Sequence, residues 1–296
     1  MYLIIGGSTK SGTTSLYKYL TDHPETTAAF TKETRYFLDK DYPLKRKDYE
    51  KHNEKFIDLF DKKNNLKIEA TPDYLHSYGT PERIKEYLSD NYHIVFILRE
   101  PVERIKSWYK FSKSRGMIEE KMTFESFINS QKKTYTDNNC QQYQLVKEQG
   151  LYSKYIANFE RHIPKERILI YTLDELKKNP KKVTQEICRK TNIDPHFYDE
   201  YDFQIENKTT SRKHIKIYRA YNTALRIIRD KTSRYPTIKN NLLKPKRLID
   251  RAIDKLTIEN KSQDTEIQLP KEIIEQYRES WKDILVKINF DRNAEQ

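Results

Sequence analysis

The sequence predicts an α/β fold, a single P-loop-type domain with a central parallel sheet flanked by helices. Short and almost unbroken apolar runs alternate with amphipathic segments, which is typical of strands buried on both faces of a parallel sheet. A glycine-rich loop directly follows the first apolar run. The length of 296 residues suits one domain of this class. We expect that domain to span residues 1–296, with 231–270 as a flexible or peripheral helical insert because it is polar and poorly patterned.

The elements follow in order along the chain. The expected strands are the apolar runs 2–6, 26–30, 66–70, 93–98 and 167–171. Helical periodicity predicts helices at about 13–20, 80–90, 101–114, 122–130, 152–161 and 269–290. A further helix should begin after Thr172, a favourable N-cap, and end before Pro180. Because strand and helix alternate, we expect βαβ units that form one parallel sheet.

Composition describes a polar protein. Hydrophobic residues make up 36% and charged residues 34%, and no apolar run approaches the roughly 18 residues of a membrane span. The opening M-Y-L-I-I-G-G resembles a strand rather than a secretory signal. Cys140 and Cys188 lie far apart without His or Cys at ligand spacing, so we expect neither a disulfide framework nor a metal site. These features predict a cytoplasmic protein.

The net charge of +12 favours an anionic partner. Nucleic acid, an anionic membrane contacted peripherally and an anionic small substrate all satisfy this condition. Lysine and arginine are spread along the chain, with a denser stretch at 208–251. That stretch is either a solvated helix face with a basic loop or a binding surface, and charge does not decide between them.

The loop after the first expected strand has the spacing of a phosphate-binding P-loop. It reads G-G-S-T-K-S-G-T-T-S-L, so backbone N–H groups and a helix N-terminus would face one anion. A nucleotide triphosphatase places a lysine directly after the second glycine, where this chain has Thr13, and the loop lysine here is Lys10. The fourth expected strand ends in Arg99 rather than in an acid for magnesium, although Glu69 closes another strand. Triphosphate hydrolysis is therefore disfavoured.

Two stretches carry a resemblance to a known family. They are T-K-S-G-T-T-S-L and I-V-F-I-L-R-E-P-V-E-R-I-K-S-W-Y, in which an arginine closes a strand and a serine follows eight residues later. They resemble the 5′-phosphosulfate loop and the 3′-phosphate motif of the sulfotransferases that use 3′-phosphoadenosine 5′-phosphosulfate (PAPS). Weaker matches are K-E-T-R-Y-F, E-A-T-P-D-Y-L, G-L-Y-S-K-Y-I-A-N-F, I-L-I-Y-T-L-D-E-L and, in the last helix, L-P-K-E-I-I-E-Q-Y. The resemblance otherwise covers about residues 1–215.

The resemblance implies a PAPS site with two anion-binding parts. The implied contacts are Lys10, Ser11, Gly12, Thr13, Thr14 and Ser15 on the phosphosulfate, with Arg99, Ser107 and Arg212 on the 3′-phosphate. A loop after one strand and an arginine after another lie along the same sheet edge, which suits a ligand with anions at both ends. Lys10 would stabilise the bridging oxygen that becomes the leaving group. No metal is required.

The acceptor side needs a general base, because a hydroxyl has a pKa far above neutrality. Glu33 is the expected base, since K-E-T-R-Y-F resembles the segment in which glycosaminoglycan sulfotransferases carry their catalytic glutamate. His76 and His23 are the alternatives. Where those enzymes have Glu-Lys-Thr-Pro, this chain has E-A-T-P, so Ala70 cannot supply the lysine. Lys32 is the candidate to replace that charge.

The expected function is transfer of the sulfuryl group of PAPS to a hydroxyl acceptor by in-line displacement. A carbohydrate hydroxyl, on a glycan or glycolipid, is favoured by the resemblance around Glu33, and a small phenol, steroid or lipid alcohol is the alternative. A P-loop kinase or triphosphatase would instead require ATP and magnesium. A non-enzymatic nucleic-acid binder would bind arbitrary sequences with strong salt dependence. We expect no nucleic-acid partner.

Overall fold

The computed structural model describes residues 1–44, 49, 54–61, 65–119, 121–134, 140–204 and 269–293, with a few isolated positions between 217 and 253. The chain divides into two compact units. The first contains residues 1–105, 131–207 and 269–296, and the second contains residues 106–130 and 208–268. Arg212 and most of the basic stretch lie outside the described residues. The expectation of one domain with an insert at 231–270 stays a prediction.

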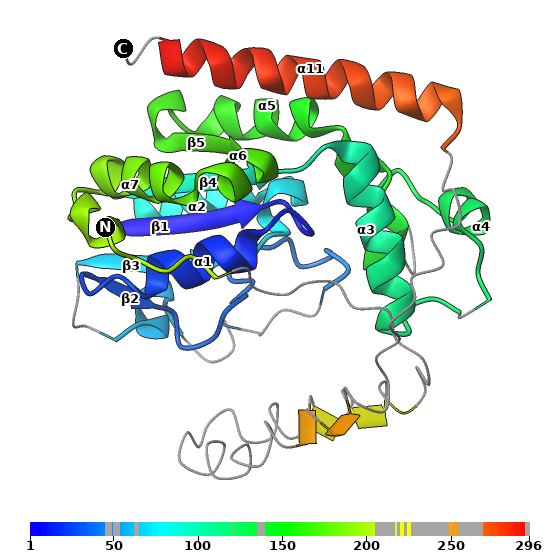
Figure 1. Cartoon of the computed structure of the whole chain (residues 1–296), viewed down its shortest axis with the longest axis horizontal. Helices are drawn as coiled ribbons and strands as arrows, with labels where there is room; N and C mark the ends of the chain where they lie inside the picture. The colour runs from blue at the N-terminus through cyan, green and yellow to red at the C-terminus, as the bar shows by residue number, and fades with distance from the viewer. Residues whose placement is uncertain are drawn as a thin grey trace. The chain divides into compact units, whose positions relative to one another are not determined.

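Five strands form an all-parallel sheet in the first unit (Figure 1). They are β1 (Tyr2–Gly7), β2 (Thr26–Ala28), β3 (Leu66–Ala70), β4 (Tyr92–Leu98) and β5 (Ile168–Thr172), in the order β2-β3-β1-β4-β5. The predicted fold class and all five predicted strands are confirmed. β2 ends at Ala28 rather than at residue 30, because Ala29 bridges to Phe60 and the Phe30 amide donates to Leu59 O at 2.9 Å.

The predicted helices are confirmed within a few residues at each end. The first unit contains α1 (Thr13–Thr21), α2 (Thr80–Leu88), α5 (Tyr152–His162), α6 (Leu173–Lys178), α7 (Pro180–Thr191) and α11 (Lys271–Asn293). Helix α3 (Pro101–Ser114) begins in the first unit and ends in the second, which also contains α4 (Phe124–Asn129). None of the helices in the described ranges has the length and apolarity that crossing a bilayer requires.

Helix α7 was missed in the sequence, because Pro180 was interpreted as a stop and not as a start. Helix α6 begins as predicted, with Thr172 Oγ1 accepting from the Glu175 amide at 3.1 Å and Glu175 Oε2 accepting from the Thr172 amide at 2.7 Å. The chain then restarts a helix immediately, since Asn179 Oδ1 accepts from the Lys182 amide at 3.1 Å. Proline is well suited to the first helical position, which needs no amide donor.

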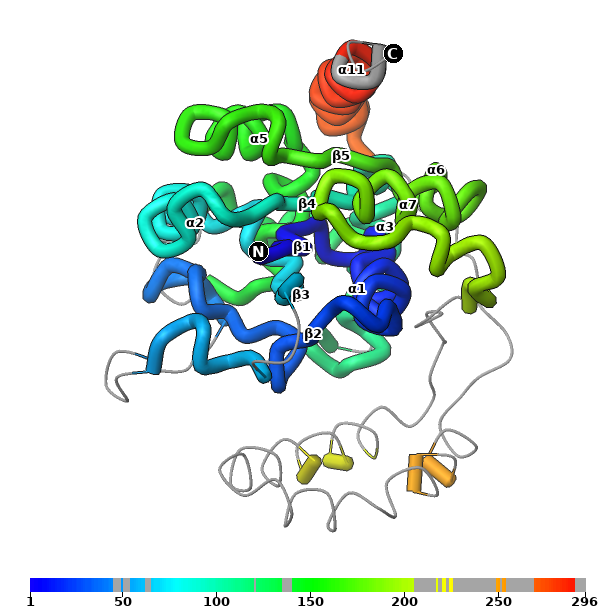
Figure 2. The backbone as a smooth tube through the Cα atoms, turned by 90° about the vertical axis from the view of Figure 1, so that its left-hand side faces the viewer, coloured from blue at the N-terminus to red at the C-terminus, as the bar shows by residue number. Residues whose placement is uncertain are grey.

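The sheet is covered by helices on both faces (Figure 2). Side chains alternate between the faces along a strand, so Ile4 belongs to one core cluster and Leu3 and Ile5 belong to the other. Helices α2, α5 and α11 pack residues into the Ile4 cluster, whereas α1, α6 and α7 pack into the second cluster. Burial on two faces explains why the strands appear in the sequence as nearly continuous apolar runs.

Candidate active site

The candidate site lies at the carboxyl edge of the sheet, where all five parallel strands end. Ligands of open α/β sheets bind at this edge. The chain leaves β1 into the loop that contains Lys10, leaves β2 toward Glu33, and leaves β4 at Arg99. Because β2, β3, β1 and β4 are consecutive neighbours in the sheet, these three predicted residues belong to segments that emerge along one edge.

Residues 7–12, named the anion loop, connect β1 to α1. The loop is anchored to the sheet by the Ser8 amide, which donates to Ile97 O at 2.7 Å, and the Ser8 and Ser11 hydroxyl oxygens lie 2.7 Å apart. Gly12 has a φ of +84°, and a Cβ added there would lie 2.7 Å from a leucine side chain, so glycine is required. Gly12 cannot cap α1 with a side chain, and the positive end of a helix is suited to bind an anion.

Lys10 lies in the anion loop with a left-handed backbone conformation, at a φ of +67°. This conformation costs a non-glycine residue about 1 kcal/mol or more, so surrounding contacts must hold it. Thr9 and Ser11 on either side are buried, whereas Lys10 is half-buried. The loop therefore fixes the Lys10 backbone in the protein while the side chain is only half-buried, and the predicted role of Lys10 toward PAPS stays a prediction.

Arg104 supports the anion loop from the protein interior, and the sequence analysis did not select it. Its side chain is fully buried, at 0% exposure. Its Nε donates to Thr9 O at 3.1 Å and its Nη2 donates to Thr9 Oγ1 at 3.0 Å. Further bonds reach Val146 O at 3.2 Å and Gln149 Oε1 at 3.0 Å. Because a buried charge is tolerated only with such partners, Arg104 fixes the loop and adds positive charge behind it.

The position of Arg104 on α3 is the signal that could have identified it. It lies beside Ile105 and one turn before Trp108, and all three side chains are buried. An arginine in the apolar stripe of a helix must find buried hydrogen-bond acceptors. Those acceptors, on Thr9 and Gln149, are 95 and 45 residues away, so the sequence can mark the residue but not its role.

Tyr152 connects the anion loop to the end of β4. Its hydroxyl donates to Arg99 O at 2.9 Å and lies 3.4 Å from Ser8 Oγ. The structure therefore brings together the two segments that carry Lys10 and Arg99. The Arg99 guanidinium is one-quarter exposed and lies 3.5 Å from Glu103 Oε2, whose side chain is exposed. Such an exposed pair contributes little stability, so a phosphate can replace the carboxylate as the partner of Arg99.

The structure does not place the other two residues predicted to contact the 3′-phosphate, Ser107 and Arg212, relative to Arg99. Ser107 lies on α3, about two turns beyond Arg99 along the chain, and belongs to the second unit. Arg212 lies outside the described residues. Their roles stay predictions. Thr13, Thr14 and Ser15, which the resemblance also assigned, form the first turn of α1 directly after the anion loop.

Glu33 lies in the segment that follows β2, with its side chain 39% exposed. Two cations flank the carboxylate, because Lys32 Nζ lies 3.2 Å from Oε1 and Arg35 Nη2 lies 3.8 Å from Oε2. Lys32 thus places a cation beside Glu33, and its role as a substitute for a lysine at position 70 stays a prediction. Ala70 itself is fully buried. The carboxylate is accessible, and the two cations beside it can attract an anionic group.

Neither alternative histidine has an accessible imidazole. His76 is buried, its Nε2 lies 3.1 Å from Gln149 O, and its pKa is well below the ordinary value because of burial and the charge of Arg104. His23 is also buried, and its Nε2 lies 2.8 Å from Asp194 O. His23 precedes β2 and therefore lies at the amino edge of the sheet, not near the predicted site. Both histidines have structural contacts, which leaves Glu33 as the base candidate.

Glu69 is a second carboxyl group near Glu33, and it is fully buried at the end of β3. Its pKa is raised to about 7, chiefly because burial penalises the charged form, although hydrogen bonds from Thr71 and Thr34 act in the opposite direction. The sequence placed Glu69 at a strand end as a potential magnesium acid. Within the described part of the chain, no cluster of His, Cys, Asp and Glu could hold a metal ion.

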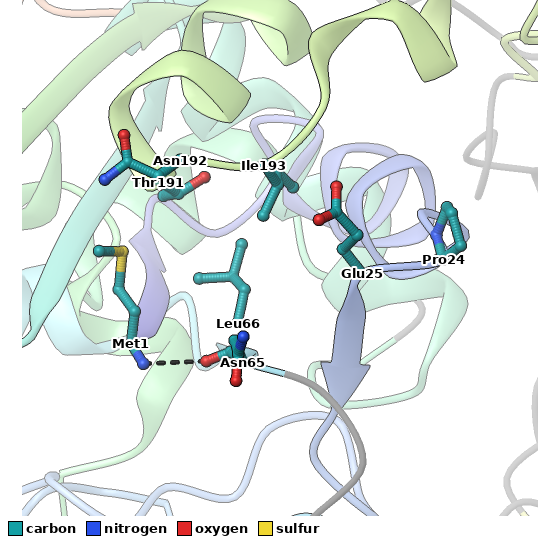
Figure 3. A pocket seen from close by; sticks show the side chains of 8 residues that line it. All are labelled: Met1, Pro24, Glu25, Asn65, Leu66, Thr191, Asn192 and Ile193. Carbon is teal, nitrogen blue, oxygen red and sulfur yellow. Dashed lines mark hydrogen bonds between the residues drawn. The ribbon is translucent and has the colours of Figure 1, made fainter.

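A pocket at the opposite edge of the sheet is separate from this site (Figure 3). It is lined by Met1, Pro24, Glu25, Asn65, Leu66, Thr191, Asn192 and Ile193, residues that precede or begin β1, β2 and β3 or that end or follow α7. Two of its charged groups are engaged with protein atoms. The amino group of Met1 donates to Asn65 O at 2.9 Å, and Glu25 Oε2 accepts from the Asp194 amide at 2.8 Å.

The chain is similar to known proteins over most of its length. The sulfotransferase domain matches residues 2–235. The membrane-associated sulfotransferase kil1 of Dictyostelium discoideum is 39% identical over 109 residues, which are 37% of this chain and 22% of that protein. The bifunctional heparan sulfate N-deacetylase/N-sulfotransferase 3 of Homo sapiens is 25% identical over 201 residues, covering 66% of this chain and 22% of that protein.

Two further comparisons bear on relatives and fold. The heparan sulfate glucosamine 3-O-sulfotransferase 3B1 of Mus musculus is 26% identical over 203 residues, covering 66% of this chain and 48% of that protein. The chain thus spans from about a fifth to about a half of the length of these curated relatives. The sulfotransferase from Alicyclobacillus acidocaldarius shares the fold, with a TM-score of 0.58 at 20% identity and coverage of 75% and 92%. These findings confirm the resemblance of the two motifs, and the chain belongs to the sulfotransferase domain family.

Proposed function

We propose that this protein transfers the sulfuryl group of PAPS to a hydroxyl acceptor. The observation that carries the proposal is the anion loop, where Lys10, a helix N-terminus and the buried charge of Arg104 meet, and which Tyr152 ties to Arg99. PAPS carries a phosphosulfate at one end and a 3′-phosphate at the other. Cationic side chains at the ends of two adjacent strands suit these two groups.

The proposed reaction is an in-line displacement. The acceptor oxygen forms a bond to sulfur, the bond between sulfur and the bridging oxygen breaks, and adenosine 3′,5′-bisphosphate leaves. Lys10 donates a hydrogen bond to the bridging oxygen as that oxygen gains negative charge. Glu33 accepts the proton that the acceptor hydroxyl loses.

Thermal unfolding with three ligands tests the proposed donor. Adenosine 3′,5′-bisphosphate should raise Tm without any metal, because a ligand that binds the folded state stabilises it. ATP with magnesium and double-stranded DNA should have little effect. Stabilisation by ATP and magnesium, with none by the bisphosphate, would instead identify a kinase or triphosphatase. Transfer of labelled sulfuryl from PAPS to a panel of glycans, glycolipids and phenols then tests the reaction itself.

We further propose a carbohydrate acceptor that carries negative charge. Lys32 and Arg35 lie within 4 Å of Glu33, and these cations would attract a uronate or sulfate beside the reacting hydroxyl. The names of several relatives, which are heparan sulfate sulfotransferases, support the same class. Exclusive transfer to an uncharged phenol, steroid or lipid alcohol would overturn the acceptor class while leaving the donor proposal intact.

A cytoplasmic location and a peripheral contact with anionic membranes are additional proposals, which rest on composition and charge. Fractionation of cells that express the protein tests the location. Sedimentation with vesicles that contain phosphatidylserine tests the contact, and a basic surface should give binding that weakens as salt rises. Recovery from an extracellular fraction would contradict the first proposal, and sedimentation equal to that with neutral vesicles would contradict the second.

Arg99→Ala should weaken binding of adenosine 3′,5′-bisphosphate by about 10- to 100-fold, because a bidentate charged contact to phosphate is lost. Binding of adenosine 5′-phosphosulfate, which lacks the 3′-phosphate, should change by less than about threefold. Calorimetric titration of both ligands measures the difference. The matched control is Arg189→Ala, which removes an exposed arginine of α7. Equal losses for both ligands would show that Arg99 does not contact the 3′-phosphate.

Arg104→Met should destabilise the protein by about 2–4 kcal/mol, because buried acceptors lose their charged donor. It should also weaken adenosine bisphosphate binding, since Thr9 and the anion loop are no longer held. Arg167→Met serves as the control, as it removes an arginine paired with Asp90 at the amino edge. Denaturant unfolding and calorimetry measure the two effects. Undiminished affinity in Arg104→Met would remove Arg104 from the account of the donor site.

A further inference from the structure

The segment that carries Glu33 is bound along its backbone by the end of β3. The amides of residues 33, 34 and 35 donate in turn to Ala70 O at 3.0 Å, to Glu69 Oε1 at 3.1 Å and to Thr71 Oγ1 at 3.1 Å. Three consecutive residues of one strand end therefore satisfy three consecutive amides of the neighbouring segment. The carboxylate of Glu69 lies at the middle of this arrangement.

Two threonine hydroxyls add hydrogen bonds between this segment and the end of β3, and the donor and acceptor of each bond are defined. Thr71 Oγ1 accepts from the Arg35 amide, so its single proton is donated to Glu69 Oε1, at 2.7 Å. Thr34 Oγ1 accepts from the Tyr36 amide at 3.3 Å and donates to Glu69 Oε1 at 2.9 Å. Glu69 Oε1 thus receives three hydrogen bonds, directly or indirectly from the backbone of residues 34–36.

Burial of the Glu69 carboxyl group costs free energy, which indicates that its contacts have a structural or functional role. The side chain is 0% exposed, and its Oε2 has no hydrogen-bond partner among the described residues. Burial of a carboxyl group is unfavourable unless specific contacts compensate. The hydrogen bonds to this group come from Thr34, in the segment beside Glu33, and from Thr71. A hydrophobic residue would fill the same place at lower cost but could not bind the segment.

The backbone of the segment needs such support. Glu33 and Arg35 both have left-handed conformations, with φ values of +62° and +60°. Each non-glycine residue in this region is unfavourable and persists only where surrounding contacts determine its conformation. The bonds from Glu69, Ala70 and Thr71 supply contacts at these positions, so they determine where the Glu33 carboxylate lies.

We infer that Glu69 and Thr71 are positioning residues that hold Glu33 in its reactive place at the carboxyl edge of the sheet. The inference rests on the proposed function, because it gives Glu33 the role of general base. Glu69 does not contact the acceptor or the donor in this account; it acts through the backbone of residues 33–36. The donor-binding elements, the anion loop and Arg99, are outside this contact and should be unaffected by its loss.

The isosteric change Thr71→Val removes the hydroxyl while keeping the volume of the buried side chain. We expect kcat for sulfuryl transfer to fall about 10- to 100-fold, because a displacement of about 1 Å at a reacting group has effects of this size. The dissociation constant of adenosine 3′,5′-bisphosphate should stay within about twofold. Thr71→Ser restores a hydroxyl and should recover kcat to within about threefold of the wild type. Tm and circular dichroism of each variant verify folding.

A double variant distinguishes positioning from general damage. In a Glu33→Gln background, Thr71→Val should lower kcat by less than about twofold, because residues that act through one group are not additive. A merely structural threonine would cause the same fold-change in both backgrounds. Equal fold-changes, or a normal kcat in Thr71→Val alone, would overturn the inference. If Thr71→Val does not fold, Thr34→Val and Thr34→Ser test the same carboxylate contact from the other side.

The same experiments distinguish a wrong positioning role for Glu69 and Thr71 from a wrong assignment of the reaction. If the wild-type protein transfers no sulfuryl group from PAPS to any acceptor of the panel, the proposed function fails first. If the wild type is active and Glu33→Gln is equally active, the positioning role fails while the proposed function stands. Activity lost in Glu33→Gln and in Thr71→Val, recovered in Thr71→Ser and non-additive in the double variant is the result that supports the inference.

Discussion

Lys10→Ala is expected to lower kcat for sulfuryl transfer by about 100- to 1,000-fold, the usual effect of removing a donor aimed at developing negative charge. The anion loop should keep its conformation in the variant, because Ser8 anchors it to the sheet, Thr9 anchors it to Arg104 and Gly12 begins α1. Alanine has a Cβ as lysine does, so the left-handed conformation costs the two residues a similar amount. Single-turnover kinetics with labelled PAPS measure the chemical step directly.

Two companion variants make the Lys10 result specific. Lys10→Gly relieves the left-handed conformation and should be as inactive as Lys10→Ala, which separates lost charge from backbone strain. Lys18→Ala removes a lysine of α1 that pairs with Asp22 and is half-exposed, and it should retain wild-type kcat. Wild-type turnover in Lys10→Ala would exclude the proposed stabilisation of the leaving group by this residue.

Glu33→Gln is expected to lower kcat by about 100-fold or more, because a positioned general base contributes a factor of this size. Affinity for adenosine 3′,5′-bisphosphate should be nearly unchanged, since Glu33 belongs to the segment after β2 and the donor contacts follow β1 and β4. Single-turnover transfer kinetics and calorimetric titration measure the two effects.

The control for this change is Glu86→Gln, which alters an exposed glutamate on α2. Tm measurements are needed in both cases, because Glu33 lies close to Lys32 and Arg35 and its loss leaves two cations unbalanced. Near-normal turnover in Glu33→Gln would remove Glu33 as the base. His76 and His23 would then be replaced in turn, although both are buried and bonded to backbone oxygens.

Local patterns in the sequence were sufficient to predict the sheet and the anion loop. The strands are continuous apolar runs because both faces are covered, and the loop follows the first strand with the glycine that the start of α1 requires. Helix α7 was missed because Pro180 is compatible with both the end of one helix and the start of another. The choice depended on the Asn179 side chain, which the proline pattern alone does not reveal.

Residues that act through long-range contacts could not be predicted in the same way. The roles of Arg104 and Tyr152 depend on partners in the anion loop and at Arg99, which are distant in sequence. The sequence shows Glu69 as an acid at the end of a strand. It does not show that Glu69 accepts hydrogen bonds from Thr34, which lies in the segment after β2. His23 was an alternative base, but it follows the first helix, and an α-helix after a strand returns the chain to the opposite edge of the sheet.

The central position of β1 has a consequence for how the protein is made. β1 is translated before both of its neighbours in the sheet, which are β3, through pairs such as Leu3 with Ile68, and β4, through pairs such as Tyr2 with Tyr92. Pairings between strands so far apart along the chain slow folding and leave strand edges open in the meantime. The bond from Ser8 to Ile97 also waits for β4. The anion loop is therefore synthesised well before β4 but gains its binding conformation only after β4 has left the ribosome.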